Sequence, residues 1–299
     1  MPAVGTPSLE QLSIFAAVAD TGSFSAAARR LGRAQSVVSY GIAQLEAQLG
    51  LALFDRSGRL PALTEAGRAL LGDARRAGGA VDSLRARAAG LQAGLEATLS
   101  LGVDVMLPHR VLVAVLEAFA AAFPTVALRL CIEALGGVPA LVEAGACALG
   151  VGTELPNFPA SLRLHPVGSV HLIPVAAPGH PLVAAAADAE AVRDATQIVL
   201  TDRTELTAGR DIAVLSLKTW RIGDLGAKHA LLRAGLGWGN MPEALVTEDL
   251  ATGRLVRLHL AEGRAHDYPL ALIERRDQLL GPAGRWLAER FRQTLADPA

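Results

Sequence analysis

The sequence of 299 residues has only two cysteines, no long apolar run and a net charge of -1. Cys131 and Cys147 cannot form the disulfide framework that stabilises small secreted proteins. No stretch reaches the roughly 18–20 uncharged apolar residues that are needed to cross a bilayer. The first residues also lack a basic segment followed by an apolar one, so we expect no signal peptide. We therefore expect a cytoplasmic protein that makes no membrane contact.

The sequence also lacks the motifs of catalysis and of tightly bound cofactors. Its seven histidines are scattered, and no group of His, Cys and carboxylate residues has the spacing of a zinc site. There is no Gly-rich phosphate loop and no Gly-x-Ser-x-Gly nucleophile turn. Both cysteines fall in apolar segments predicted to be strands, which favours inert core thiols over redox sensors. We expect no cofactor, no metal and no enzymatic activity.

Length and charge distribution indicate more than one domain. A chain of this length exceeds one typical domain, and a hydrophobic content of 51% leaves enough apolar material for separate cores. Residues 1–94 hold ten arginines and seven acidic residues, whereas the remainder holds 18 basic and 22 acidic residues. The N-terminal third is thus mildly basic, which is weak evidence for an anionic partner.

Residues 8–49 have the pattern of three short helices. Ser8 and Gln11 have the spacing of a capping box that begins the first helix. The second helix is expected over 24–31, and the third, over 35–49, follows after about three residues that include a glycine. Two helices joined by such a turn form a helix-turn-helix, which the sequence predicts at about 24–43.

The polar side of the third helix is suited to reading DNA. The first turns of a recognition helix reach base edges, and its N-terminal amides face phosphate. The segment that follows the helix alternates and turns at Ser57-Gly58, which indicates a short two-stranded wing. We place the DNA-binding domain at 7–64; the alternative is a small helical domain that contacts protein. The expected contacts to double-stranded DNA are Ser25, Arg33, Gln35, Ser36, Ser39, Tyr40, Arg56, Ser57 and Arg59.

Residues 8–67 resemble the winged helix-turn-helix of the bacterial LysR-type transcriptional regulators. The resemblance rests on GSFSAAARRL, QS-x-VS, LE-x-QLG, LFDR and LTEAG, in this order and without a gap. It implies a sequence-specific transcriptional regulator with a two-lobed, periplasmic-binding-protein-like effector domain, usually assembled as a homotetramer. Ala34 stands where family members often have a capping Ser or Thr, and Tyr40-Gly41 replaces a basic or amide pair. These departures leave the preferred bases open.

Residues 65–94 are expected to form a dimerisation helix and a hinge. A helix over 65–92 would be about 40 Å long, and its apolar residues recur at alternating spacings of four and three, which is the seam of a coiled coil. Such a stripe needs a partner, and a helix from a second subunit would supply it; packing within the same chain is the alternative. The seam residues are Leu70, Ala74, Ala77, Val81, Leu84, Ala88 and Leu91.

From residue 95 onward, strand and helix patterns alternate, which predicts a mainly parallel α/β sheet. We expect one lobe to comprise about 95–165 and 268–299, and the other about 166–267. Residues 238–242 are expected to form a tight turn that leads into a helix. Ligands of open parallel sheets bind at the carboxyl ends of the strands, which in a two-lobed domain places them between the lobes.

The residues that follow each predicted strand are the expected walls of this site. Their acidic groups and one arginine favour a small organic effector with hydrogen-bond donors, such as an aromatic acid or a nucleoside-like molecule, on which the tryptophans could stack. Helix capping and core packing are the alternatives. The candidate effector contacts are Asp104, Val105, Met106, Glu133, Thr201, Asp202, Arg203, Trp220 and Trp238.

The fold class expected is α/β, with an N-terminal winged helix-turn-helix, a long linker helix and a two-lobed effector domain. Two other functions stay open. A solute-binding module would use the same two lobes, but the DNA-binding front argues against it. An enzyme with an appended helix-turn-helix would need a nucleophile or metal constellation, and the sequence shows none.

Overall fold

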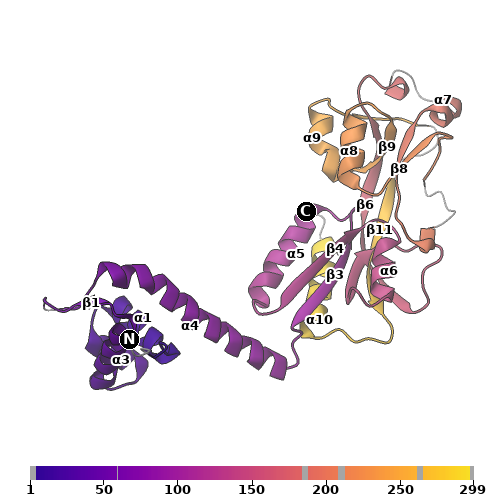
Figure 1. Ribbon diagram of the computed structural model, residues 1–299. Coiled ribbons are helices and arrows are strands. Elements are labelled where there is room, and N and C mark those ends of the chain that lie inside the picture. The colour runs from indigo at the N-terminus through magenta and orange to yellow at the C-terminus, as the bar shows by residue number, and fades with distance from the viewer. Residues whose placement is uncertain (1–4, 59, 184–187, 208–212, 261–264, 297–299) are drawn as a thin grey trace. The chain divides into compact units, whose positions relative to one another are not determined.

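The computed structural model forms two compact units, residues 1–90 and 91–299 (Figure 1). Among the helices that the structure describes, none is both long enough and apolar enough to cross a membrane. The structure describes residues 5–58, 60–183, 188–207, 213–260 and 265–296.

The first unit consists of three helices, a two-stranded wing and the beginning of a long helix. The capping box forms as predicted: the Ser8 hydroxyl accepts from the Gln11 N–H at 3.2 Å, and the Gln11 side chain accepts from the Ser8 N–H at 2.6 Å. Gly22 and Gly32 end the first two helices in the left-handed conformation. The elements are α1 (Leu9–Thr21), α2 (Phe24–Leu31), α3 (Gln35–Leu49), β1 (Phe54–Asp55), β2 (Ala62–Leu63) and α4 (Glu65–Gln92).

A glycine inside α3 permits the close packing of α1 and α3. A Cβ atom at Gly41 would lie 2.9 Å from the Cδ1 atom of Ile14, so an alanine there would press on α1. A helix-interior glycine costs about 1 kcal/mol relative to alanine, and this contact offsets that cost. The core around it buries Phe15, Val18, Val38, Ile42 and Leu45.

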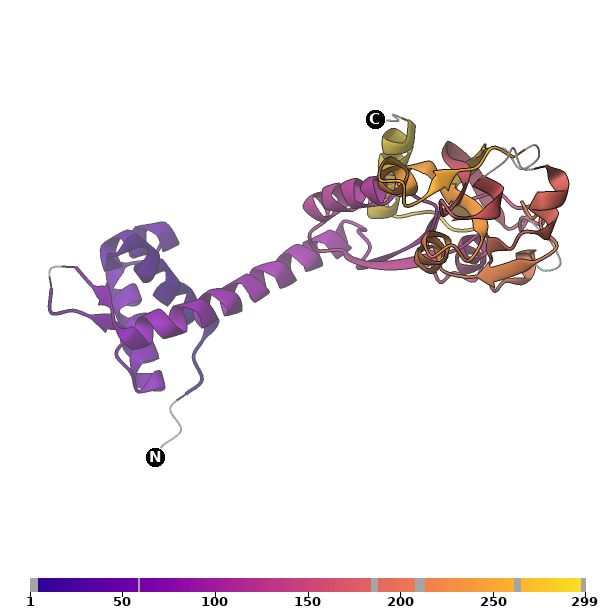
Figure 2. The same ribbon diagram turned by 90° about the horizontal axis from the view of Figure 1, so that it is seen from above.

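The long helix α4 buries only its first turns. Ala74 is buried, and Arg75 forms an ion pair with Asp20 at 2.5 Å, which ties α4 to α1. Farther along, Leu84 and Leu91 are 66% and 51% exposed. Figure 2 shows α4 as one continuous rod of 28 residues, about 42 Å long at 1.5 Å per residue. The C-terminal part of the predicted seam thus lies on the surface.

In the second unit, the nine strands of the described residues form one sheet, in the order β4-β3-β5-β11-β6-β9-β7-β8, with β10 paired to β6. The strands at both ends of this order run parallel, β3 with β4 and β5, and β7 with β8 and β9. The bounds are β3 (Thr98–Asp104), β4 (Ala127–Glu133), β5 (Leu149–Gly152), β6 (Leu162–Ala176), β7 (Gln197–Leu200), β8 (Thr219–Ile222), β9 (Trp238–Pro242), β10 (Val256–Arg257) and β11 (His266–Arg275).

The expectation of a mainly parallel sheet is wrong for the centre of the sheet. The long strands β6 and β11 are antiparallel to each other, β11 is antiparallel to β5, and β6 is antiparallel to β9. An apolar run predicts a buried strand but says nothing of its direction. Here the chain leaves one lobe along β6 and returns along β11, so the two connecting strands must run in opposite directions.

Two smaller expectations also need correction. Residues 238–242 form β9, paired with β6 and fully buried, rather than a turn, because small and apolar side chains let the segment pass through the middle of the sheet. Cys131 lies in β4 as predicted, whereas Cys147 lies just before β5 and not within a strand.

Helices cover the sheet at both ends (Figure 1). We call the part around β3, β4 and β5 lobe I and the part around β7, β8 and β9 lobe II. Lobe I carries α5, α6 and α10, and lobe II carries α7, α8 and α9. The bounds are α5 (His109–Ala122), α6 (Gly137–Glu143), α7 (Ala189–Asp194), α8 (Leu225–Arg233), α9 (Glu243–Ala251) and α10 (Pro282–Ala296), with 3-10 turns at Pro181–Val183 and Glu205–Thr207.

Two glycines of α4 provide a test of how this helix docks on the first unit. A Cβ atom at Gly67 would overlap the carbonyl oxygen of Leu53, whereas a Cβ atom at Gly79 would meet nothing within 4 Å. We expect Gly67→Ala to destabilise the N-terminal unit by roughly 1–3 kcal/mol, because backbone atoms must shift. Gly79→Ala should stabilise α4 by about 0.5–1 kcal/mol.

Urea unfolding of the full chain followed by circular dichroism measures both effects. The three tryptophans, Trp220, Trp238 and Trp286, all lie in the second unit, so their fluorescence transition should not move in either variant. Equal unfolding midpoints for the two variants would contradict this docking.

Candidate functional site

The beginning of α3 presents a row of hydrogen-bonding side chains. The Ser25 hydroxyl of α2 donates to the Gln35 side-chain oxygen at 2.9 Å, which holds the two helices of the predicted helix-turn-helix together. Ser36 is exposed and Ser39 is half-buried. Tyr40 is 67% exposed, and its hydroxyl accepts from Gln44 at 3.1 Å. Apart from Ser25, which comes from α2, these side chains all project from the first two turns of α3.

Two further residues lie beside this row. Arg33 forms an exposed ion pair with Glu10 at 3.3 Å, and such surface pairs contribute little stability. Val37, which the sequence analysis missed, is 45% exposed on the first turn of α3. An apolar side chain there can contact a thymine methyl group in a major groove. In the sequence Val37 stands beside Val38 between two serines, and an apolar residue there gives no signal of a DNA contact.

The wing is attached to α3 through Glu46. One carboxylate oxygen of Glu46 accepts from the Leu53 and Phe54 N–H groups at 2.8 and 3.1 Å, and the other pairs with Arg56 at 2.8 Å. The Arg56 guanidinium also lies 5.2 Å from the centre of the Phe24 ring, a cation–π distance. Arg56 therefore fixes the wing while half of its side chain stays exposed.

Of the other wing residues, Ser57 is exposed, and its N–H donates to the Asp55 carboxylate at 2.9 Å. That hydrogen bond lowers the pKa of Asp55. Arg59, expected as a phosphate contact, lies outside the described residues.

In the second unit, a cavity of about 60 Å³ lies where β6 and β11 pass between the lobes. Its walls come from both lobes: Met106 and Leu135 follow β3 and β4, whereas Ile198 and Leu200 belong to β7. Its polar lining includes Gln197, Lys228, Asn240 and Tyr268. Of these residues, only Met106 was predicted from the sequence as an effector contact.

Asp104 lies behind this cavity, 1% exposed, and accepts two hydrogen bonds. The Tyr268 hydroxyl donates to it at 2.7 Å and the Met106 N–H at 2.9 Å. Burial raises the pKa of Asp104 to about 6, although both hydrogen bonds oppose the rise. Burial and the neighbouring Asp104 charge raise the pKa of Tyr268 well above its ordinary value. Asp104 thus orients Tyr268 toward the cavity.

Two polar groups of this lining, Lys228 and Asn240, could not be singled out from the sequence. Lys228 is 4% exposed, and burial lowers its pKa to about 8. Asn240 is 8% exposed, and its side-chain oxygen accepts no hydrogen bond from the described residues. A lysine in a short helix and an asparagine in a short apolar segment carry no motif.

A wider pocket of about 450 Å³ lies between α6 of lobe I and the end of β7 in lobe II, and four of the expected contacts meet there. The Asp202 carboxylate accepts from the Gly136 N–H of lobe I and from the Thr204 N–H at 3.1 Å. A Cβ atom at Gly136 would lie 2.8 Å from that carboxylate, so only glycine permits this close contact between the lobes. The four residues are Glu133, Thr201, Asp202 and Arg203.

The remaining expected contacts are dispersed. Val105 and Met106 line an apolar pocket of about 170 Å³ beside the beginning of α5. Trp220 is 41% exposed on β8, at the edge of the sheet. Trp238 is fully buried in the core of lobe II, and its ring N–H donates to the Ser216 hydroxyl at 3.1 Å. Neither tryptophan is among the residues that line the cavities described here.

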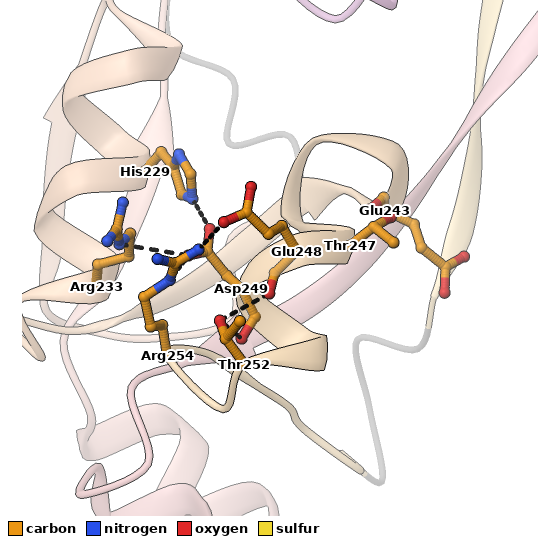
Figure 3. Close-up of polar contacts among 8 residues, drawn as sticks. All are labelled: His229, Arg233, Glu243, Thr247, Glu248, Asp249, Thr252 and Arg254. Atoms are coloured by element: carbon orange, nitrogen blue, oxygen red, sulfur yellow. Dashed lines mark hydrogen bonds and ion pairs between the residues drawn. The ribbon is translucent and has the colours of Figure 1, made fainter.

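A network of charges positions α8 against α9 (Figure 3). The buried Asp249 carboxylate accepts from His229 at 2.6 Å and from Arg254 at 2.7 Å, and Arg233 lies 3.4 Å away. Burial favours a higher pKa for Asp249, but the hydrogen bonds from His229 and Arg254 outweigh it, and the pKa is lowered. His229 directly follows Lys228, so anchoring His229 toward α9 turns Lys228 toward the sheet.

The described residues contain no group of three or more His, Cys, Asp or Glu side chains that could hold a metal ion. Cys147 is buried, and burial followed by the nearby Cys131 raises its pKa to about 12. A thiol with so high a pKa is a poor nucleophile.

Comparisons with known proteins agree for the two parts of the chain. The family model "Bacterial regulatory helix-turn-helix protein, lysR family" matches residues 9–68, and the model "LysR substrate binding domain" matches residues 92–296. The HTH-type transcriptional regulator AceR of Acinetobacter baumannii is 29% identical over 97% of this chain and 98% of its own. The transcriptional activator AllS of Klebsiella pneumoniae is 30% identical over 83% of this chain and 93% of its own.

Among solved structures, ArgP from Mycobacterium tuberculosis is 27% identical and covers 96% of each chain with a TM-score of 0.52. By name, AceR is a transcriptional regulator and AllS is a transcriptional activator. The comparisons thus match both the helix-turn-helix unit and the two-lobed α/β unit to one family.

The buried carboxyl of Asp104 makes stability depend on pH. Its pKa of about 6 in the folded state lies above the ordinary value of 3.8, so between these values the folded state binds more protons. Stability should therefore fall as the pH rises from 4 to 6, by about 1.4 kcal/mol per unit at most. Asp104→Asn removes this term, and the difference in unfolding free energy between wild type and variant should change by up to about 3 kcal/mol between pH 4 and pH 7.

Urea unfolding of the full chain, followed by tryptophan fluorescence at four pH values, measures this difference. Asp188→Asn on the exposed N-cap of α7 is the control for a generic loss of carboxylate, and it should track wild type in this range. A difference between wild type and Asp104→Asn that stays constant with pH would contradict the buried position of Asp104.

Proposed function

Since the chain belongs to the LysR family of DNA-binding transcriptional regulators with an effector-binding domain, we propose that α3 and the wing hold one half-site of a promoter and that a small organic molecule bound between the lobes controls this binding. The observation that carries the proposal is the exposed polar face at the beginning of α3. Gln35, Ser36 and Tyr40 project there with no core to fill. Such a face suits the first turns of a recognition helix in a major groove.

Within this arrangement the contacts divide into two kinds. Gln35, Ser36 and Ser39 read base edges, and Tyr40 donates to a phosphate or packs against a sugar. Arg33, Arg56, Ser57 and Arg59 hold the backbone and set the register. Ser25 acts through its hydrogen bond to Gln35, which it orients. The Arg56 guanidinium reaches a phosphate with the half of its side chain that Glu46 and Phe24 leave exposed.

Dimerisation through α4 supplies the second recognition helix. Leu84 and Leu91 expose more than half of their side chains on a helix that is otherwise rich in charge, and apolar surface of this kind is stable when a second helix covers it. Two recognition helices about one DNA turn apart read a two-fold site. We propose that two such dimers form a tetramer, which acts on promoter DNA in the cytoplasm.

The effector acts through the lobes. Asp202 of lobe II and Gly136 of lobe I touch directly, and the cavity that Lys228 and Asn240 line is also bounded by both lobes. A molecule that fills the cavity changes how favourable this contact is. It can shift the regulator only by binding one arrangement of the lobes more tightly than the other.

The division of the DNA contacts makes a prediction with two variants. Gln35→Ala should lower binding to the preferred promoter site by about tenfold and relax the preference at one or two base pairs, because a base-reading amide is lost. Arg56→Ala should weaken binding to all sequences alike and reduce the slope of log K against log salt by about 1, because one phosphate contact is lost.

Footprinting and fluorescence anisotropy at several salt concentrations distinguish the two effects. Gln92→Ala and Arg87→Ala, at exposed positions of α4, are the matched controls and should behave as wild type. If Gln35→Ala leaves the site preference intact, α3 is not the base-reading helix; if Arg56→Ala leaves the salt slope unchanged, Arg56 is not a phosphate contact.

The α4 seam makes a separate prediction about assembly. Leu84→Glu places a charge in the proposed interface and should dissociate the assembly into species of half its mass or less at micromolar concentration. Ser83→Glu adds the same charge one position away, about 100° around the helix, and should leave the mass unchanged. Sedimentation velocity measures both. Equal masses for both variants and wild type would place the dimer contact elsewhere.

A further inference from the structure

The chain uses lysine very sparingly, and one of its two lysines is buried. It contains 26 arginines but only Lys218 and Lys228. Lys218 is exposed, as expected for this residue type. Lys228 is 4% exposed and lines the inter-lobe cavity. Lys228 thus brings a compact ammonium group to a buried position, in a chain whose positive charge otherwise comes almost entirely from arginine.

Lys228 has no anionic partner among the described residues. No carboxylate there lies within ion-pair distance of its ammonium, although the next residue, His229, is paired with Asp249. The stem of Lys228 passes close to β9, since a Cβ atom at Gly239 would lie 3.2 Å from the Lys228 Cε atom. Gly239 precedes Asn240 in β9, and both Lys228 and Asn240 line the cavity.

The neighbouring polar side chains differ in whether hydrogen bonds within the protein already satisfy them. The Asn240 oxygen, buried with the rest of that side chain, accepts no hydrogen bond from the described residues. Gln197 also lines the cavity, but its amide donates to the Ala213 carbonyl at 2.8 Å and accepts from the Leu215 N–H at 2.8 Å. Gln197 therefore belongs to the scaffold, whereas Asn240 retains an acceptor.

A buried cation and a buried acceptor are each unfavourable unless a partner satisfies them. The two together favour a partner that carries both an anionic group and a hydrogen-bond donor. The cavity of about 60 Å³ is several times the roughly 10–15 Å³ that one buried water requires, which corresponds to a molecule of about five non-hydrogen atoms.

We propose that the effector is a small 2-hydroxycarboxylate whose carboxylate pairs with Lys228 and whose hydroxyl donates to the Asn240 side-chain oxygen. This inference rests on the proposed function in one respect, namely that the inter-lobe cavity is the effector site. It adds the chemical class of the ligand and the two residues that recognise it.

Two other classes of ligand fit the cavity less well. An amino acid would bring a second ammonium close to Lys228, where the repulsion is strong at low dielectric. An aromatic acid or a nucleoside is larger than the cavity of about 60 Å³ in the arrangement of the lobes described here, and the buried ring of Trp238 is not available for stacking on it. A neutral hydroxyl is the donor that satisfies Asn240 without adding charge.

Isothermal titration calorimetry of the full chain with four matched molecules tests the ligand class. Glycolate carries both groups, acetate lacks the hydroxyl, ethylene glycol lacks the carboxylate, and glycine replaces the hydroxyl by an ammonium. We expect glycolate to bind about tenfold more tightly than acetate and glycine, and ethylene glycol to show no binding. Tighter binding of glycine, or equal binding of acetate and glycolate, would overturn the assignment of the hydroxyl.

Variants test the two residues. Lys228→Met keeps the length of the side chain and removes the charge, and it should abolish glycolate binding. Its thermal midpoint without ligand should equal or exceed that of wild type, because a buried charge without a partner is replaced by an apolar group. Asn240→Leu should weaken glycolate at least tenfold and acetate by less. Lys218→Met, the other lysine, is the matched control and should bind glycolate as wild type does.

If Lys228→Met binds glycolate like wild type, or if it unfolds at a clearly lower temperature, Lys228 serves the fold and the proposal is wrong. Promoter binding measured in parallel distinguishes this result from a failure of the proposed function. Glycolate that binds through Lys228 without changing promoter affinity would leave the recognition site in place and refute effector control. If a molecule controls promoter binding equally well in wild type and in Lys228→Met, effector control stands and the proposed recognition by Lys228 is wrong.

Discussion

The antiparallel pair of β6 and β11 is the constraint on which the effector half depends. These two strands pair from Leu162–Arg275 at one end to Leu172–His266 at the other, and β5 and β9 attach to their outer edges. Both lobes are therefore parts of one hydrogen-bonded sheet and share one apolar core. The lobes can move relative to each other only by twisting or bending this pair. Leu172, His266 and Tyr268 of this pair line the cavity, so the proposed effector would bind against the strands that join the lobes.

Around the cavity, an outer set of hydrogen-bonded polar groups positions the polar side chains that line it. Asp249 anchors His229 and so turns α8, which directs Lys228 inward. Asp104 accepts from the Tyr268 hydroxyl and fixes that ring at the opposite wall. The outer groups are saturated with hydrogen bonds, whereas Lys228 and Asn240 at the centre are not satisfied by the described residues. This distribution suits a binding site, because supporting residues whose hydrogen bonds are already made hold Lys228 and Asn240 in place without competing for a ligand.

A structural feature could be predicted from the sequence where residues close together in the chain determine it. The capping box at Ser8 and the long helix over residues 65–92 follow from residues within one or two turns, and the structure has both where the pattern places them. The direction of β6 and β11 depends on where the chain goes next, so apolar runs could not reveal it. The burial of Lys228 is also non-local, since it needs Gly239 on another strand to make room. Trp238 was expected to contact the effector but is buried in the core of lobe II. An aromatic residue at a strand end can pack in the core as readily as against a ligand.

The size of the cavity limits how a regulator of this kind can be switched. Moving a two-state equilibrium from 1:99 to 99:1 requires about 5.5 kcal/mol of differential binding. A ligand of about five atoms can supply at most roughly 1.5 kcal/mol per atom, so most of its binding energy must be realised in one arrangement of the lobes. Lys228 and Asn240 belong to lobe II, so their contacts with a ligand do not themselves distinguish one arrangement of the lobes from another. Contacts with Met106 and Leu135 of lobe I do, because these residues line the same cavity in the arrangement that also contains the Asp202–Gly136 contact. Under the proposed function, the contacts with lobe I are therefore the part of the binding energy by which a small molecule would favour one arrangement of the lobes.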